Sequence, residues 1–279
     1  MPRDARIRLD ELVFSRGLAP SRSAARALIM AGLVLVKGEV SDKAGTPVDP
    51  TAHVTVKERP RFVSRAGGKL DAALHAFGVD VTGSSALDVG ASTGGFVDCL
   101  LQRGATRVIA LDVGRGQLDA RLRADSRVHV IEGVNARYLA PASLPWRPEL
   151  LTMDVSFISV TKVLPAVIAC LAAPYDGVIL IKPQFEAGPK DVGKGGIVRD
   201  LEVHRRVLLE TATFVVAHLG ATLVALCRSS VPGTGGNIEY FFHLTSGGAN
   251  GVALGTLDEV IEEAVAGEGQ ARGRGGSEA

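Results

Sequence analysis

Long apolar runs, clustered cysteines and a signal-like leader are all missing from this sequence. No apolar run approaches the roughly 20 residues of a membrane-spanning helix, because His218 and Gly220 interrupt the best candidate segment. The N-terminus is polar, which predicts no secretory signal. Cys99, Cys170 and Cys227 lie far apart without metal-ligand spacing, so we expect them to be reduced core residues. The sequence therefore predicts a cytoplasmic protein without a metal site or a membrane partner.

Neither sign of charge dominates the chain, but the two signs are unevenly distributed. The 279 residues carry 31 basic and 30 acidic side chains. Residues 1–70 hold 13 lysines and arginines against 7 aspartates and glutamates, whereas the remainder holds 18 against 23. A basic segment on a mildly acidic body is typical of a module that meets a polyanion, although a solvated surface would give the same count.

Residues 1–58 have the pattern of a small α+β domain. Apolar spacing predicts a helix over residues 8–16 and a second helix that begins at Ser21 or Ser23 and ends at Gly32. Short strands over residues 33–36 and 53–56 complete the expected module.

This segment resembles the RNA-binding domain first seen in ribosomal protein S-four. The likeness rests on Arg8-Leu9-Asp10, Ser21-Arg22, the helix end at residues 29–32 and residues 34–38. The resemblance implies docking on structured RNA. The matching phosphate contacts would be Arg8, Arg22, Arg26 and Lys37. The alternative is that these residues are ordinary surface charges.

After a linker at residues 59–64, residues 65–246 alternate between strands and helices. The expected strands are 85–89, 107–113, 128–132, 149–154, 177–182, 222–227 and 238–244, and the expected helices are 66–77, 95–103, 115–123, 159–172 and 201–218. This alternation predicts a Rossmann-like, doubly wound α/β sheet. The last strand follows without a helix, so we expect it to run antiparallel, as in seven-stranded methyltransferases. Residues 247–279 read as a short helix and a disordered tail.

A glycine-rich turn follows the first strand of this sheet. Its candidate cofactor contacts are Asp88, Gly90, Ser92, Thr93, Gly94, Gly95 and Phe96. Asp112 ends the next strand, where such folds place an acid on a ribose. A nicotinamide dinucleotide is the alternative ligand, but the G-x-x-x-G-G spacing suits S-adenosyl-L-methionine (SAM) better than a pyrophosphate. Residues 188–194 match the G-x-x-x-x-G-K part of a phosphate-binding loop. Gly195 occupies the next position, where that motif requires Ser or Thr, so the sequence excludes an ATPase of that type.

Three charged residues are expected at one edge of the sheet. Asp154 and Lys182 end parallel strands, and Glu239 begins the antiparallel strand. Because the carboxyl ends of parallel strands and the amino end of an antiparallel strand share an edge, these side chains should converge where α/β folds bind ligands.

The chain as a whole resembles the TlyA family of rRNA 2′-O-methyltransferases, whose catalytic domain is related to FtsJ. The residues that carry this likeness are Val63-Ser64-Arg65, Gly67, Lys69-Leu70, the loop from Asp88 to Phe96, Asp112-Val113-Gly114, Asn135-Ala136-Arg137, residues 154–159, residues 182–186 and residues 236–241. The resemblance implies SAM as cofactor, a cytidine ribose of small- or large-subunit rRNA as target, and a catalytic tetrad of Lys69, Asp154, Lys182 and Glu239. Asn135 stands where FtsJ relatives have an acid that contacts adenine.

The expected roles follow from the chemistry of a ribose hydroxyl, which is a weak acid that must be deprotonated and positioned. Lys182 would be the base and Asp154 would orient it. Lys69 would stabilise the developing alkoxide, and Glu239 would hold Lys69 or the ribose. Two alternatives stay open: a membrane-lytic protein, because family relatives bear a haemolysin label, and an RNA-binding ribosome factor without catalysis.

Overall fold

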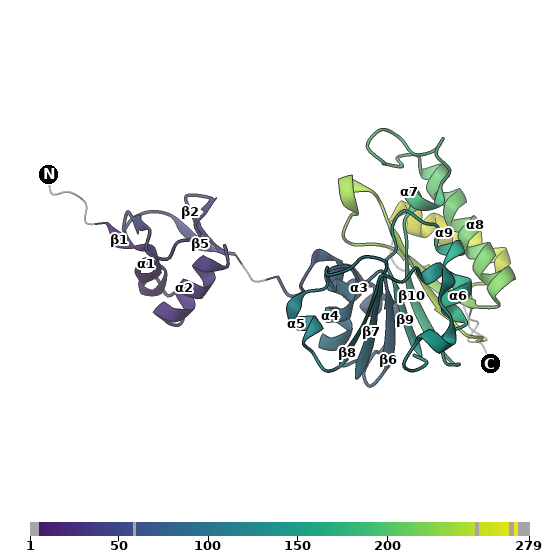
Figure 1. The fold of residues 1–279 in the computed structure, drawn as a ribbon. Coiled ribbons are helices and arrows are strands. Elements are labelled where there is room, and N and C mark those ends of the chain that lie inside the picture. Colours follow the sequence, from purple (N-terminus) through teal and green to yellow (C-terminus); the bar gives the residue numbers. More distant parts are fainter. Residues whose placement is uncertain (1–5, 58–59, 249–250, 268–270, 273–279) are drawn as a thin grey trace, which may run out of the picture. The chain divides into compact units, whose positions relative to one another are not determined.

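The computed structural model describes residues 6–57, 60–248, 251–267 and 271–272. The chain divides into two compact units, Met1–Arg61 and Phe62–Ala279. Both are drawn in Figure 1.

The N-terminal unit contains two short helices and short antiparallel strands around a small apolar core. Its elements are β1 (Ile7–Arg8), α1 (Leu9–Ser15), α2 (Arg22–Met30), β2 (Val34–Val36), β3 (Glu39–Val40), β4 (Pro47–Val48) and β5 (Val54–Val56). Ser21 begins α2 as expected, since its Oγ accepts a hydrogen bond from the Ala24 amide at 3.1 Å. Fully buried Leu9 and Ile29 join the two helices in one core. The pair β1–β4 and strand β3 were not expected, because two-residue strands leave no hydrophobic pattern to read.

The C-terminal unit is a doubly wound α/β domain. Its main elements are α3 (Arg65–Phe77), β6 (Ser85–Val89), α4 (Gly95–Gln102), β7 (Arg107–Asp112), α5 (Ala120–Arg123), β8 (Val128–Glu132), β9 (Leu150–Met153), α6 (Leu164–Ile168), β10 (Asp176–Ile181), α7 (Pro183–Glu186), α8 (Leu201–Leu219), β11 (Thr222–Arg228), β12 (Tyr240–Thr245), α9 (Leu257–Ala266) and β13 (Ala271–Arg272). Short 3₁₀ turns lie at Ala136–Tyr138, Pro141–Ser143, Val160–Lys162, Thr234–Gly236 and Leu254–Thr256.

The sheet of this unit confirms the predicted fold class. Its strand order is β13-β11-β12-β10-β9-β6-β7-β8. Strand β12 pairs antiparallel with both β10 and β11, while β10, β9, β6, β7 and β8 are parallel neighbours. Alternate residues of each strand enter opposite cores: Ile179 packs on the side of α6, α8 and α9, and Val178 packs on the side of α3 and α4. The two helix layers are seen on either side of the sheet in Figure 1.

Three predicted elements differ from the structure. Helix α5 begins at Ala120 rather than near residue 115, because Gly116 adopts a positive φ and Asp119 caps the helix through the Arg121 amide. The helix predicted over residues 159–172 is a 3₁₀ turn followed by the short α6. In the tail predicted to be disordered, Ala271–Arg272 pairs with β11; residues 273–279 lie outside the described residues.

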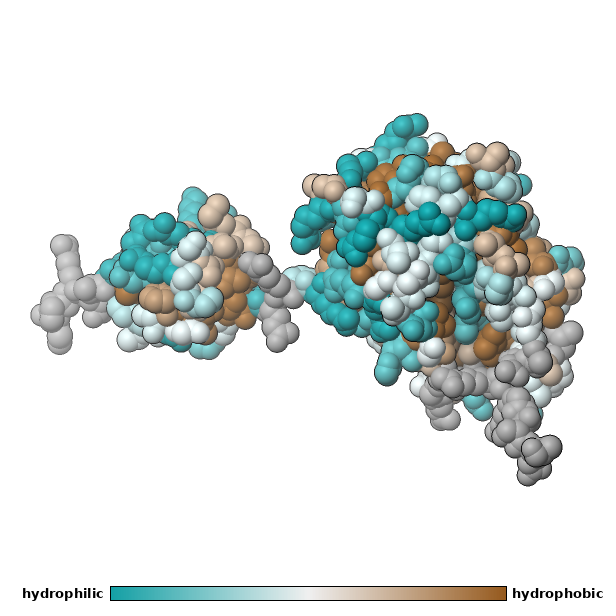
Figure 2. All heavy atoms as spheres, turned by 90° about the horizontal axis from the view of Figure 1, so that it is seen from below, coloured by the Kyte–Doolittle hydropathy of each residue, from teal (hydrophilic) through white to brown (hydrophobic). Residues whose placement is uncertain are grey.

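Hydrophilic and apolar side chains are interspersed over the visible face of the C-terminal unit in Figure 2. Within the described ranges, no helix combines the length and apolar character needed to cross a membrane.

Candidate active site

Two buried lysine–carboxylate pairs lie in the C-terminal unit. The Nζ of Lys69, on α3, is 2.5 Å from Oε2 of Glu239, which precedes β12. The Nζ of Lys182, which follows β10, is 2.5 Å from Oδ1 of Asp154, which follows β9. Lys69, Lys182 and Glu239 are all less than 10% exposed: 6%, 8% and 3%. Charges that are so deeply buried require a partner, and each lysine has its own acid.

The backbone around these pairs is shaped by glycine. The amide of Asp154 donates to the Val89 carbonyl at 2.9 Å, which brings the residue after β9 next to the turn after β6. Gly90 makes this approach possible, since it has φ +86° and a Cβ there would lie 2.4 Å from the Asp154 carbonyl oxygen. Gly233 likewise lies against the Glu239 carboxyl, where a Cβ would be 2.2 Å from Oε1. Glycine at positions 90 and 233 therefore allows the chain to approach both acids closely.

A cavity of about 390 Å³ lies beside Asp154. Among the residues predicted to bind a cofactor, it is lined by Gly90, Ser92, Asp112 and Asn135. Other lining residues include Val113, Gln117, Val134, Val155, Ser156, Phe157 and Ile158. The cavity therefore combines apolar walls with two carboxylates, Asp112 and Asp154.

Asp112 and Asn135 are oriented by backbone amides. Asp112 Oδ2 accepts from the Ser92 amide at 2.7 Å and Oδ1 accepts from the Gly114 amide at 2.6 Å. The Oδ1 of Asn135 accepts from the Arg137 amide at 3.0 Å, which leaves the side-chain NH₂ group as a donor. A nucleoside with a cationic tail matches this set: a carboxylate for ribose hydroxyls, an amide donor for a base, and a second carboxylate for the positive charge.

The N-terminal unit holds two of its candidate RNA-binding residues on one carboxylate. Asp10 is fully buried, and it accepts from Arg8 Nε at 3.0 Å and from Arg26 Nε at 2.7 Å. Hydrogen bonds from Arg8, joined by those from Arg26, hold the pKa of Asp10 well below its usual range. The two arginine side chains are nevertheless 49% and 55% exposed, so their remaining N–H groups face solvent. Arg22 lies 3.7 Å from Glu11 in an exposed pair.

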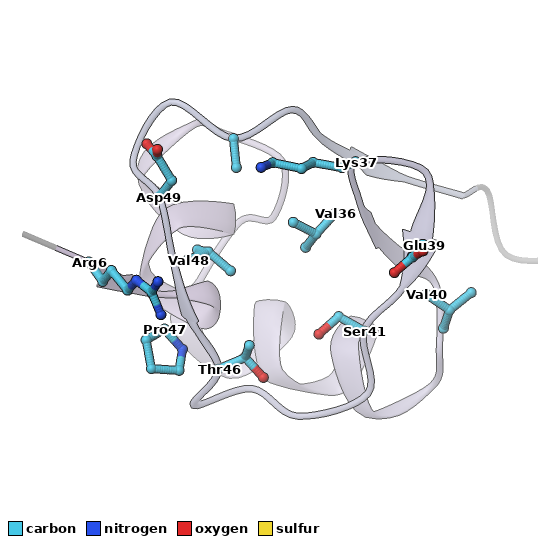
Figure 3. Close-up of a pocket in the computed structure, with 11 residues that line it drawn as sticks. Arg6, Val36, Lys37, Glu39, Val40, Ser41, Thr46, Pro47, Val48 and Asp49 are labelled. Atoms are coloured by element: carbon cyan, nitrogen blue, oxygen red, sulfur yellow. The ribbon is translucent and has the colours of Figure 1, made fainter. Parts of the chain in front are cut away.

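Lys37 lies at a different place in this unit. It occupies the tight turn between β2 and β3 with φ +54°. Its side chain is on the rim of a cavity whose floor includes Val36 and Val48 (Figure 3). The structure thus brings Arg8 and Arg26 together on Asp10, and it places Lys37 on the hairpin.

The model of FtsJ-like methyltransferases matches residues 62–246. The chain belongs to the FtsJ-like methyltransferase family. The S4 domain model matches residues 7–54.

Relatives of this FtsJ-like chain span almost its whole length. The 16S/23S rRNA (cytidine-2′-O)-methyltransferase TlyA of Mycobacterium tuberculosis is 43% identical over 93% of this chain and 97% of its own. Hemolysin A of Brachyspira hyodysenteriae is 43% identical over 85% of this chain and 99% of its own. A solved structure of a hemolysin-named protein from Streptococcus thermophilus is 39% identical, with a TM-score of 0.70 over 94% of this chain and 96% of that one. The predicted resemblance to the TlyA family is confirmed.

Five residues predicted to contact the cofactor are absent from the lining of the cavity in the described part of the chain: Asp88, Thr93, Gly94, Gly95 and Phe96. A Cβ on Gly94 would meet Leu118 and Leu122, and one on Gly95 would meet Ser64 Oγ at 2.3 Å. These two glycines therefore allow close packing at the start of α4, and the cofactor contacts of all five residues stay predictions.

Asp88 lies in β6, just before the glycine-rich turn that begins at Gly90, and is fully buried. Burial raises the pKa of its carboxyl to about 8, although a hydrogen bond from Thr152 Oγ1 at 2.7 Å opposes the shift. The charges of Asp154 and Asp112 act in the same direction as burial. Its Oδ2 has no hydrogen-bond partner among the described residues, which suits a neutral carboxyl. Through Thr152, the Asp88 side chain therefore links β6 to β9.

Two residues of the site were not assigned from the sequence, although both belong to the motif at residues 154–159. Ser156 Oγ accepts from Lys182 Nζ at 2.9 Å. Phe157 is 91% exposed, and its φ of +62° is a conformation that costs a non-glycine residue about 1–3 kcal/mol. Its ring lies 5.0 Å from that of Phe185, centre to centre. Because such a backbone angle leaves no trace in residue type, only the structure reveals that an exposed Phe157 packs on a half-buried Phe185.

Proposed function

We propose that this chain is a SAM-dependent methyltransferase that acts on the 2′-hydroxyl of a cytidine in small- or large-subunit ribosomal RNA. The observation that carries the proposal is the ion pair between Lys182 and Asp154, because Asp154 also lines a cavity whose donors and acceptors suit SAM. The family match and the printed function of the mycobacterial relative support the substrate class.

The residues that would hold SAM are those already oriented in the cavity. Asp112 would accept from the ribose hydroxyls, and Asn135 would donate to the base. Asp154 would lie near the positive charge. When bound, SAM supplies a methyl group on a sulfonium, which is already a strong electrophile. The protein therefore has mainly to position and deprotonate the nucleophile.

In its uncharged amine form, Lys182 would accept the proton of the ribose 2′-hydroxyl at Nζ and become the ammonium that pairs with Asp154. Asp154 and Ser156 hold that nitrogen at 2.5 and 2.9 Å, which fixes the direction from which the hydroxyl must approach. Lys69 would stabilise the negative charge that develops on the ribose oxygen, and Glu239 orients Lys69 at 2.5 Å. In this proposal Lys182 is the base and pairs with Asp154, and Lys69 stabilises the alkoxide and pairs with Glu239.

The exposed ring of Phe157 supports a nucleotide as the second substrate. Enzymes that modify nucleotides commonly stack the extruded base on an aromatic side chain. Phe157 lines the cavity that Asp154 also lines, and Phe185, its ring partner, lies 5.7 Å from Lys182 Nζ. A base on this pair would bring its ribose toward Lys182.

In the N-terminal unit, Arg8, Arg22, Arg26 and Lys37 would contact phosphates of the RNA. Half-exposed arginines with free N–H groups are suited to that contact. An rRNA substrate implies that the protein works in the cytoplasm, with ribosomal subunits as its partners and without a membrane.

The test is to incubate the full chain with tritium-labelled SAM and separate unmethylated 30S and 50S subunits, and then to count label in the RNA. We expect label in the RNA of at least one subunit. If the chain binds SAM but labels neither subunit, ribosomal RNA is not its substrate. If it binds no SAM, the methyltransferase proposal itself fails.

A further inference from the structure

Glu186 makes contacts that the proposed mechanism does not use. It is the last residue of α7, four positions after Lys182, and it is half-buried. Its Oε2 accepts from Ser159 Oγ at 2.5 Å, and its Oε1 accepts from the Val160 amide at 2.8 Å. Both donors lie at the far end of the loop that begins at Asp154.

The loop of residues 154–159 forms one wall of the cofactor cavity. Its residues Asp154 to Ile158 all line that cavity. Near its beginning, the loop is held by a hydrogen bond from the Asp154 amide to the Val89 carbonyl. The Nζ of Lys182 also pairs with the Asp154 carboxylate and donates to Ser156 Oγ. Near its end, Glu186 is the acceptor for both Ser159 and Val160. Residues 182 and 186 therefore hold the two ends of the same loop.

This loop contains the strained backbone of Phe157. A positive φ at a phenylalanine persists only where the surroundings fix the chain on both sides. Without the bonds to Glu186, the end of the loop would be free to relax, and the wall formed by Val155 and Ile158 would move with it.

We propose that Glu186 is a positioning residue that holds the loop of residues 154–159 against the cofactor, so that SAM binds a preformed wall. Glu186 does not line the cavity itself and acts through Ser159 and Val160. The inference rests on the proposed function, because it takes SAM as the ligand of this cavity.

The chain provides a closely matched control. Glu149 also accepts from a serine hydroxyl and a backbone amide, both of Ser85, at 2.5 and 2.7 Å. Ser85 begins β6 and Glu149 immediately precedes β9, so this pair lies at the amino edge of the parallel strands, opposite the cavity. Glu186→Ala and Glu149→Ala thus remove the same two kinds of hydrogen bond at opposite edges of one sheet.

The experiment is calorimetric titration of SAM into the full-length wild type, Glu186→Ala, Glu186→Gln and Glu149→Ala, with thermal unfolding of each. We expect both alanine variants to lose thermal stability, but only Glu186→Ala to bind SAM more weakly, by about tenfold. Glu186→Gln should bind within about twofold of wild type, because its amide can accept from Val160 and donate to Ser159.

Equal SAM affinity in Glu186→Ala and Glu149→Ala would overturn the proposal, since Glu186 would then only stabilise the fold. If Glu186→Ala does not fold, Ser159→Ala decides: a severalfold loss of affinity supports the role, and an unchanged affinity contradicts it. If the wild-type chain binds no SAM, the proposed function fails. If the wild type binds SAM and Glu186→Ala binds it equally well, only the positioning role of Glu186 fails.

Discussion

Two aspartates, one in each unit, are both fully buried and yet have opposite electrostatic surroundings. Asp10 lies between the guanidinium groups of Arg8 and Arg26, and its pKa is lowered. Asp88 has a threonine hydroxyl as its partner, and its pKa is raised to about 8. Burial alone therefore does not decide the charge of an acid, because a nearby cation can outweigh desolvation.

The same difference separates the two proposed uses of basic residues. In the N-terminal unit one acid holds two half-exposed arginines, so positive charge is left over for a partner such as RNA. In the C-terminal unit each buried lysine lies 2.5 Å from one carboxylate, so each pair presents no excess charge, and we propose that these fixed lysines act on the reacting ribose. Exposed positive charge that is not fully paired favours RNA binding, whereas buried lysines that are each paired with one acid suit a catalytic role.

The largest effect is expected at Lys182, which we propose as the general base. Lys182→Ala should lower the rate of methyl transfer by roughly a thousandfold, since a positioned general base contributes about 10²–10⁴. SAM binding, measured by calorimetry, should persist. Lys162→Ala, at an exposed lysine of the same unit, serves as the control. Substantial turnover by the Lys182 variant would remove it as the base.

The second effect compares the loss of an acid in each unit. Glu239→Ala leaves Lys69 buried and unpaired, which should cost about 3–5 kcal/mol of unfolding free energy. Asp10→Ala should cost only about 1 kcal/mol in charge interactions, because Arg8 and Arg26 can turn into water. Chemical denaturation of the two variants measures both quantities. A larger loss for Asp10→Ala would contradict the distinction between matched and surplus charge.

The third effect concerns surplus charge. Arg22→Glu combined with Arg26→Glu should weaken RNA binding by more than tenfold at low salt and reduce the slope of log affinity against log salt. The same variant should bind SAM like wild type, because the two arginines lie in the other unit. Binding to ribosomal RNA followed over a salt series is the measurement. An unchanged slope would exclude these arginines as phosphate contacts.

The smallest effect, taken per pH unit, is the pH dependence of stability that Asp88 confers. Its pKa is higher in the folded chain than in the unfolded chain, so the folded state binds more protons and stability falls as pH rises toward about 8. Relative to Asp88→Asn, the wild type should lose about 1.4 kcal/mol of unfolding free energy per pH unit between pH 6 and 7. Asp119→Asn, at a surface acid, should show no such trend. Parallel stability curves for wild type and Asp88→Asn would show that Asp88 is ionised.

Much of this account was predictable from the sequence, because it depends on patterns that extend over many residues. The alternation of strands and helices predicts the sheet, and the missing helix before β12 predicts its antiparallel direction. The positions of Asp154 and Lys182 after consecutive strands predict a shared edge, and their side chains are in contact.

What the sequence did not reveal depends on close three-dimensional packing. Gly94 and Gly95 also serve close packing, since Leu118 and Leu122 lie beside Gly94 and Ser64 Oγ lies beside Gly95. The strained Phe157 and the acceptor role of Glu186 arise from contacts between loops that residue type does not encode. Likewise, the sequence shows Asp10 only as one acid among basic residues, whereas the structure shows that it is buried and binds both Arg8 and Arg26.

The most direct test of the central claim is the chemical identity of the product. Subunit RNA that has been methylated by the wild-type chain would be digested to nucleosides and analysed by mass spectrometry against standards. Deprotonation of a ribose hydroxyl by Lys182 predicts 2′-O-methylcytidine. Cytidine methylated on its ring, with no ribose methylation, would contradict it.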